Sequence, residues 1–129
     1  MPTASEKLKN WLCTYPGWEW ENIGLYPKAL EEISRQQDVL GNSTVGCRYQ
    51  FALFWQMTGQ GNEAEDGQKM LDFQYWVQQQ SASGKAPVLG DIPEQEKLRV
   101  EKGGLTAGAQ TVTYTATLIA DFMKVYEVN

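Results

Sequence analysis

The chain has 129 residues, with 16 acidic and 11 basic side chains and no histidine. A chain of this length supports one hydrophobic core, so we expect a single domain spanning residues 1–129. The net charge of −5 opposes tight binding to phosphate backbones, and Arg35, Arg48 and Arg99 are too scattered to form a basic patch. No apolar run reaches roughly 18 residues and no leader-peptide pattern is present, so we expect no membrane association.

Residue types that carry common chemistry are missing or badly spaced. Without histidine the chain lacks the usual general base near neutral pH and the commonest zinc ligand. Cys13 and Cys47 have no CxxC spacing, so we interpret them as buried free thiols. The glycines of residues 59–61 and 103–104 lack the spacing of a phosphate-binding loop. We therefore predict no catalytic residue, no metal, no cofactor and no enzymatic activity.

The N-terminal part predicts a short helix followed by a strand. Thr3 and Glu6 have the spacing of a capping box, and apolar residues follow helical spacing from there until residues 15–17. Alternating rings and acids at residues 18–23 favour a half-buried strand. Residues 27–34 favour a helix on local grounds, because proline suits a first helical turn and apolar residues recur three apart.

The rest of the chain predicts strands on both sides of a second helix. Every second residue from 45 to 57 is apolar, which predicts a long antiparallel strand with one buried face. Residues 62–80 have the periodicity of an amphipathic helix. Residues 97–102 alternate as a strand before a glycine break at 103–104, and residues 111–126 predict a strand long enough to be bent or bulged. The expected class is α+β, with two helices packed on a mainly antiparallel sheet.

Several packing and turn motifs add a family resemblance. They lie at residues 36–42, at 48–53, at the helix end around Trp76 that leads to 86–91, at 114–117 and at 125–126. From about residue 3 to 127 the chain resembles the minor capsid or tail-terminator proteins of tailed bacteriophages and prophages. The resemblance implies the order helix, three strands, helix, two strands, and this order makes residues 29–37 a strand. The tryptophan-rich stretch at residues 18–20 has no counterpart in the family pattern.

The same resemblance implies a structural virion protein. Such a subunit assembles as a ring, a homohexamer, on the head-proximal end of the tail tube, stops tube polymerisation and docks the head connector. The implied partners are further copies of the chain, the tail tube protein and the head–tail connector. DNA passes through such a ring without sequence-specific binding. The implied location is the virion tail, and the host cytoplasm during assembly.

Exposure and polarity suggest which residues contact other copies or partners. We expect these contacts in two turns and on one charged strand, at Leu40, Gly41, Asn42, Gly59, Gln60, Gly61, Arg99 and Glu101.

Two other functions stay open on the sequence. A small-ligand or peptide-binding module would place Trp18, Trp20 or Trp55 in an open cleft. A small enzyme without histidine would use carboxylates, at least one of which would have a strongly perturbed pKa in a pocket.

Overall fold

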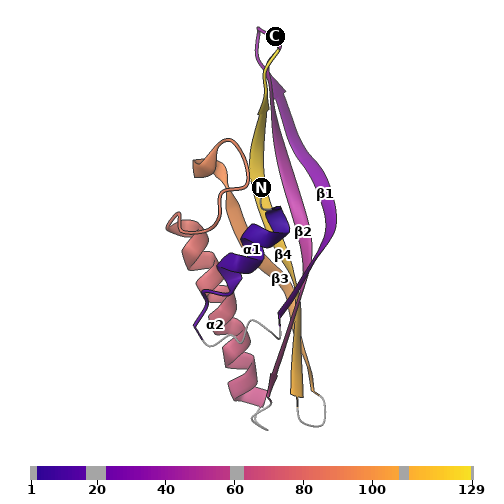
Figure 1. Cartoon of the computed structure of the whole chain (residues 1–129), viewed down its shortest axis with the longest axis vertical. Coiled ribbons are helices and arrows are strands. Elements are labelled where there is room, and N and C mark those ends of the chain that lie inside the picture. Colours follow the sequence, from indigo (N-terminus) through magenta and orange to yellow (C-terminus); the bar gives the residue numbers. More distant parts are fainter. Residues whose placement is uncertain (1–2, 17–22, 59–62, 108–110, 129) are drawn as a thin grey trace.

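Two helices lie on one side of a long antiparallel sheet (Figure 1). The computed structural model describes residues 3–16, 23–58, 63–107 and 111–128. In chain order the elements are α1 (Ala4–Leu12), β1 (Ile23–Gln37), β2 (Ser43–Thr58), α2 (Glu63–Ala82), the 3-10 turn η2 (Pro93–Gln95), β3 (Lys97–Ala107) and β4 (Thr111–Tyr126). The expected α+β class, with both helices packed on an antiparallel sheet, is confirmed.

The first half of the chain differs from the local prediction in one element. In the described residues two strands precede α2 where three were expected, because β1 runs without interruption from Ile23 to Gln37. The helix predicted at residues 27–34 is wrong, and the strand implied by the resemblance at 29–37 is found within β1. Pairing along β2 satisfies the β1 backbone and overrides the weak local helix preference. Of the strand predicted at 18–23, residues 18–22 lie outside the described residues.

Both predicted helices are present. The Thr3 hydroxyl accepts a hydrogen bond from the Glu6 amide at 3.1 Å, so this half of the predicted capping box begins α1. The second predicted helix is α2, which extends two residues beyond the expected end at residue 80. Within the described ranges, neither helix is long and apolar enough to cross a bilayer.

The sheet has the order β1-β2-β4-β3, with every neighbouring pair antiparallel. β2 and β4 pair in one unbroken register from Ser43 opposite Tyr126 to Thr58 opposite Thr111. Of the predicted bend or bulge in residues 111–126, the bulge is not found against β2: the register shifts lie in the outer strands, at two places in β1 and one in β3. Edge strands can bulge because only one neighbour constrains them.

The glycines at 103–104 lie inside β3 and do not end the strand as predicted. A Cβ atom on Gly103 would lie 2.5 Å from the Gln74 amide nitrogen of α2. The absence of a side chain therefore lets β3 pass close beneath the helix, and the register shift between Glu101 and Gly104 occurs at this point.

The core fills the layer between the helices and the sheet. It takes alternate residues from the central strands, among them Phe51, Leu53 and Trp55 of β2 and Tyr114, Ala116 and Leu118 of β4. The helices contribute Leu8, Trp11, Leu12, Phe73 and Val77. Trp11 of α1 stacks on Trp76 of α2 with ring centroids 4.9 Å apart, which ties the two helices to each other.

Beyond the helices, β1, β2 and β4 continue as a narrow arm toward the hairpin between β1 and β2 (Figure 1). A small second cluster of Val45, Cys47 and Phe122 packs at the base of this arm. Both cysteines are free; Cys47 is buried as expected, and burial raises the pKa of its thiol, whereas Cys13 is only partly buried.

Truncation of the central β2 residue tests the core. Leu53→Ala should lower the free energy of unfolding by about 2–5 kcal/mol, because Leu53 is fully buried between sheet and helices and its loss leaves a cavity. Urea denaturation followed by tryptophan fluorescence measures the change. Leu71→Ala is the control, since Leu71 is 52% exposed on α2 and should change stability by less than about 0.5 kcal/mol. Equal effects of the two substitutions would contradict this packing.

Candidate functional site

The residues predicted as contacts lie in two separate places. Leu40, Gly41 and Asn42 form part of the hairpin between β1 and β2, at the far end of the arm, and Arg99 and Glu101 lie on β3. Gly59, Gln60 and Gly61 lie outside the described residues. Arg99 and Glu101 are brought together by an ion pair of 2.7 Å. Arg99 lies opposite Ile119, and the hairpin begins beside Tyr126, so the two places are about 23 Å apart along the sheet at ~3.3 Å per strand residue.

The hairpin tip, residues 38–42, is held by hydrogen bonds of its own polar groups. The Asp38 carboxylate accepts from the Leu40 amide at 2.9 Å and from the Asn42 amide at 3.0 Å. The Asp38 amide donates to the Asn42 carbonyl at 2.9 Å, which closes the loop. Gly41 has a φ of 90°, a conformation that glycine adopts without strain. The tip is therefore a built turn with a defined shape.

Apolar side chains cover the outside of this turn. Val39 is fully exposed at 101% and Leu40 at 77%, and they are joined by Val128, which is 63% exposed. The Val128 amide donates to the Asn42 side-chain oxygen at 2.9 Å, which fixes the C-terminal segment beside the tip. The polar groups thus point inward and the apolar groups outward, the reverse of an ordinary surface turn.

The sequence showed only part of this surface. The turn residues of the sequence predict the hairpin, and Leu40, Gly41 and Asn42 lie in it; their role as contacts stays a prediction. Val39 and Val128 were missed, because Val128 is 86 residues from its partner Asn42 and no local pattern joins them. The only sign of an apolar tip in the sequence is the pair of apolar residues between Asp38 and Gly41.

The face of the sheet turned away from the helices, called here the outer face, carries a chain of charged side chains. Arg48 of β2 donates to both carboxylate oxygens of Asp121 on β4, at 2.7 and 3.1 Å. Arg99 of β3 reaches the same carboxylate at 3.3 Å and also pairs with Glu101. Burial works against ionisation of Asp121, but the hydrogen bonds and charges of the two arginines outweigh it and lower its pKa. Two positive and two negative groups therefore neutralise one another.

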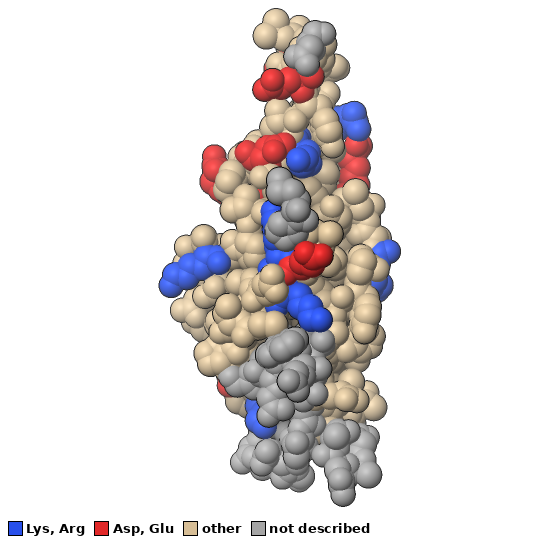
Figure 2. Space-filling view, in the orientation of Figure 1, with Lys and Arg blue, Asp and Glu red and all other residues tan. Residues whose placement is uncertain are grey.

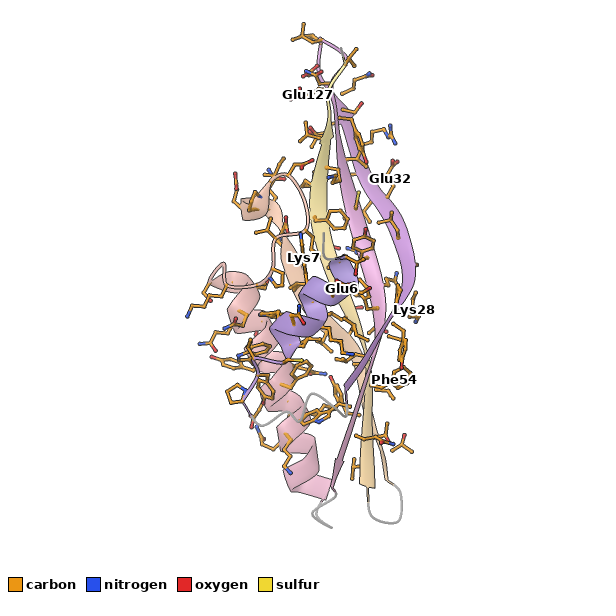
Figure 3. The ribbon with its side chains drawn as sticks, viewed as in Figure 1. Glu6, Lys7, Lys28, Glu32, Phe54 and Glu127 are labelled. Atoms are coloured by element: carbon orange, nitrogen blue, oxygen red, sulfur yellow. The ribbon has the colours of Figure 1, made fainter. Side chains whose placement is uncertain are left out.

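Farther from the hairpin tip, the outer face becomes apolar. Tyr26 of β1 and Phe54 of β2 are 59% and 41% exposed, and their ring centroids lie 5.9 Å apart (Figure 3 labels Phe54). Thr113, Thr115 and Thr117 are half-buried and alternate with core residues, so they continue this face across β4. No helix of the described residues packs over it.

A recess lies on the side of the sheet that carries the helices, between the end of α2 and the connector of residues 85–96. Its volume is about 290 Å³, and its apolar lining includes Ala86, Pro87, Val88, Leu89, Pro93 and Leu98. The Glu96 carboxylate holds the connector by accepting from the Leu89 and Gly90 amides, each at 2.8 Å. The Asp91 amide donates to the Met123 carbonyl at 2.7 Å, which attaches the connector to the edge of β4 beyond β3. The recess therefore has fixed walls.

The two alternative functions find little support in the described residues. Trp55 is 5% exposed in the core, so the expectation that it could line an open cleft is wrong; Trp18 and Trp20 lie outside the described residues. Among the described acids, hydrogen bonds lower the pKa values of Glu32, Asp91 and Asp121. A general acid needs a raised pKa. Over the described ranges no cluster of three or more metal-ligating side chains is found.

No family model, curated protein or solved structure matches the chain.

Asp121→Asn tests the outer charged group. At neutral pH the variant should be less stable than the wild type by about 1–3 kcal/mol, because the half-buried Arg48 loses its charged partner. The lowered pKa of Asp121 stabilises the folded state fully above about pH 4, and this contribution is lost as the pH falls through the folded pKa. The stability difference should therefore close in acid, as measured by urea denaturation from pH 7 to 2. Glu32→Gln, at the exposed Arg35 pair, is the control and should change little.

Asp38→Ala tests whether the tip is a built turn. The Leu40 and Asn42 amides lose their acceptor, so their hydrogen-exchange rates should rise about tenfold while β2 amides keep theirs. Asp72→Ala is the control, because Asp72 accepts one hydrogen bond from Gln68 on the surface of α2 and none from the tip. Unchanged exchange at Leu40 and Asn42 would show that Asp38 does not order the turn.

Proposed function

We propose that this chain is a structural subunit of a bacteriophage or prophage tail. It assembles as a homohexameric ring on the head-proximal end of the tail tube, stops tube polymerisation and docks the head connector. The observation that carries the proposal is the outer face of the sheet, where Tyr26 and Phe54 are exposed side by side and no described helix covers them. The family resemblance of the sequence supplies the kind of assembly.

Burial of the outer face is energetically reasonable. The apolar half gains free energy when it leaves water, at roughly 25 cal/mol per Å². In the charged half, Arg48, Arg99, Asp121 and Glu101 are already paired within the chain. A neighbour that covers this face therefore leaves none of these four charges without a partner, and avoids the larger cost of burying an unpaired ion.

A ring also needs contacts that differ on the two sides of each subunit. A subunit that presents one surface to the neighbour before it and another to the neighbour after it can close by rotation. This chain has distinct surfaces of that kind: the outer face, the hairpin tip and the connector recess. The segments at residues 48–53 and 114–117 that carry the resemblance lie on paired central strands. Of the segment at 86–91, residues 86–89 line the recess.

The charge agrees with passage of DNA through such a ring. The net charge of −5 opposes tight binding of a phosphate backbone, so DNA would pass without being held. Acidic and basic side chains are interspersed on the face shown in Figure 2.

Light scattering over a concentration series, with and without purified tail tubes, tests the function. We expect a ring of six copies in solution or on tubes, and tubes capped by it should stop growing. Tyr26→Ser with Phe54→Ser should raise the concentration needed for half assembly at least about tenfold, because the apolar centre of the contact is lost.

The matched control is Leu71→Ser with Tyr75→Ser, which removes two exposed apolar side chains from α2 and should leave assembly unchanged. A wild-type chain that stays monomeric at every concentration, and that leaves tube growth unaffected, would refute the proposed function.

A further inference from the structure

We infer that the connector of residues 85–96 is a releasable strap that closes the free edge of β4. Two carboxylates, those of Asp91 and Glu96, hold it in place, and the connector opens as one unit while the rest of the fold stays intact. This inference does not rest on the proposed function.

The edge of β4 needs a cover near the C-terminal end of the strand. The pairing of β3 with β4 reaches only to Lys97 opposite Asp121, whereas β4 continues to Tyr126. On the side of β3, the backbone groups of β4 beyond Asp121 therefore have no neighbouring strand among the described residues. Unpaired backbone groups on a strand edge are open to pairing with any extended segment unless a loop or helix covers them.

Asp91 takes the place of the missing strand. Its amide donates to the Met123 carbonyl at 2.7 Å, and its carboxylate accepts from the Val125 amide at 2.8 Å. The Lys124 ammonium lies 3.5 Å from the same carboxylate. One residue thus satisfies both an acceptor and a donor of the edge, with a side-chain oxygen where a strand would present a backbone carbonyl.

Glu96 holds the segment that reaches this edge. Its two carboxylate oxygens accept from the Leu89 and Gly90 amides, each at 2.8 Å. Gly90 comes close to β4, because a Cβ atom on it would lie 2.3 Å from the Met123 carbonyl oxygen. Glu96 immediately precedes β3, so its bonds tie the segment before Asp91 to the start of that strand. The two anchors lie on one short loop, and the position of each depends on the other.

Little else fixes the connector. Residues 85–96 are all described, and none of them is buried; Ala86 and Leu89 pack against the core as partly buried side chains. The recess of about 290 Å³ between the connector and the end of α2 is lined in part by the charged residues Glu94, Glu96, Lys97 and Asp121. No continuous apolar contact therefore seals the connector onto the body. Segments with few buried apolar contacts and exposed hydrogen bonds open at a lower free energy than the core.

Opening of the connector changes what the sheet presents. In the closed state the edge of β4 is covered where the connector reaches it, beyond the start of β3 (Figure 1). In the open state the Met123 carbonyl and the Val125 amide are exposed, and such groups are those through which an extended segment adds to a sheet edge. The connector therefore controls whether this part of the β4 edge is available for pairing.

Native-state hydrogen exchange on the whole chain, read as the protection of each amide, tests the strap through effects that cross between its anchors. Asp91→Ala leaves both Glu96 bonds in place, yet it should lower protection of the Leu89 and Gly90 amides at least about tenfold, because the connector opens as a unit. Glu96→Ala should likewise lower protection of the Val125 amide, whose acceptor Asp91 is unchanged.

Two controls accompany these variants. Glu94→Ala removes an exposed carboxylate from the 3-10 turn of the same connector and should leave all three amides as in the wild type. The Leu40 amide, which bonds to Asp38 at the hairpin tip, opens independently of the connector and should keep its protection in every variant.

The wild type supplies a test that needs no substitution. Low concentrations of urea should leave exchange at the Leu89, Gly90 and Val125 amides nearly unchanged, because opening of the connector exposes little surface. Exchange at the Leu118 amide of β4 should accelerate, since Leu118 is fully buried and its amide is freed by global unfolding.

Either of two results would overturn the inference. If each variant affects only the amides that its own carboxylate bonds, the two anchors are independent and the connector is no single strap. If the three amides of the wild type show the same urea dependence as Leu118, the connector opens only when the whole chain unfolds.

Discussion

The pairing of β2 with β4 determines the position of everything else in this chain. It continues without a shift from one end of both strands to the other, and β1 and β3 attach to its two sides. Side chains alternate between the faces of a strand, so this one register decides which residues face the helices. A slip of β2 by one residue against β4 would turn Leu53 away from the helices and bring Phe54 into the core, while Tyr114 kept its place.

The same register also builds the outer face and the hairpin tip. It sets Arg48 opposite Asp121, which allows the charged groups of the outer face to pair across the strands. It sets Ser43 opposite Tyr126, so the C-terminal residues end beside the hairpin and Val128 can bond to Asn42. The core, the outer face and the hairpin tip therefore depend on one set of backbone hydrogen bonds, and none can be moved without the others.

The sequence predicts those parts of the fold in which local pattern and final environment agree. The alternation in β2 identified its buried face, and the capping residue Thr3 located the start of α1, because both depend on neighbours a few residues away. β1 was different: Pro27 and nearby apolar residues favour a helix locally, and only pairing with β2 makes them a strand. The bulges could not be placed, because a register shift is a property of two strands and not of one.

The geometry of the candidate surfaces is partly predictable for the same reason. Arg99 and Glu101 are two residues apart on one strand, so their pairing is visible in the sequence. Arg48 and Asp121 are 73 residues apart, and no pattern links them. At the hairpin, polarity does not indicate exposure, since the polar residues build the turn and the apolar ones remain outside.

The irregular edge of β1 has a consequence for how the molecule meets its neighbours. Pro27 cannot donate a backbone hydrogen bond, and two register shifts interrupt the strand, so a foreign strand that aligned with part of this edge would lose alignment within a few residues. Edge-to-edge sheet growth, the route to fibres, is blocked by this geometry. Selection among possible neighbours is then left to side chains, whose shapes and charges discriminate, and not to backbone groups, which are the same in every protein.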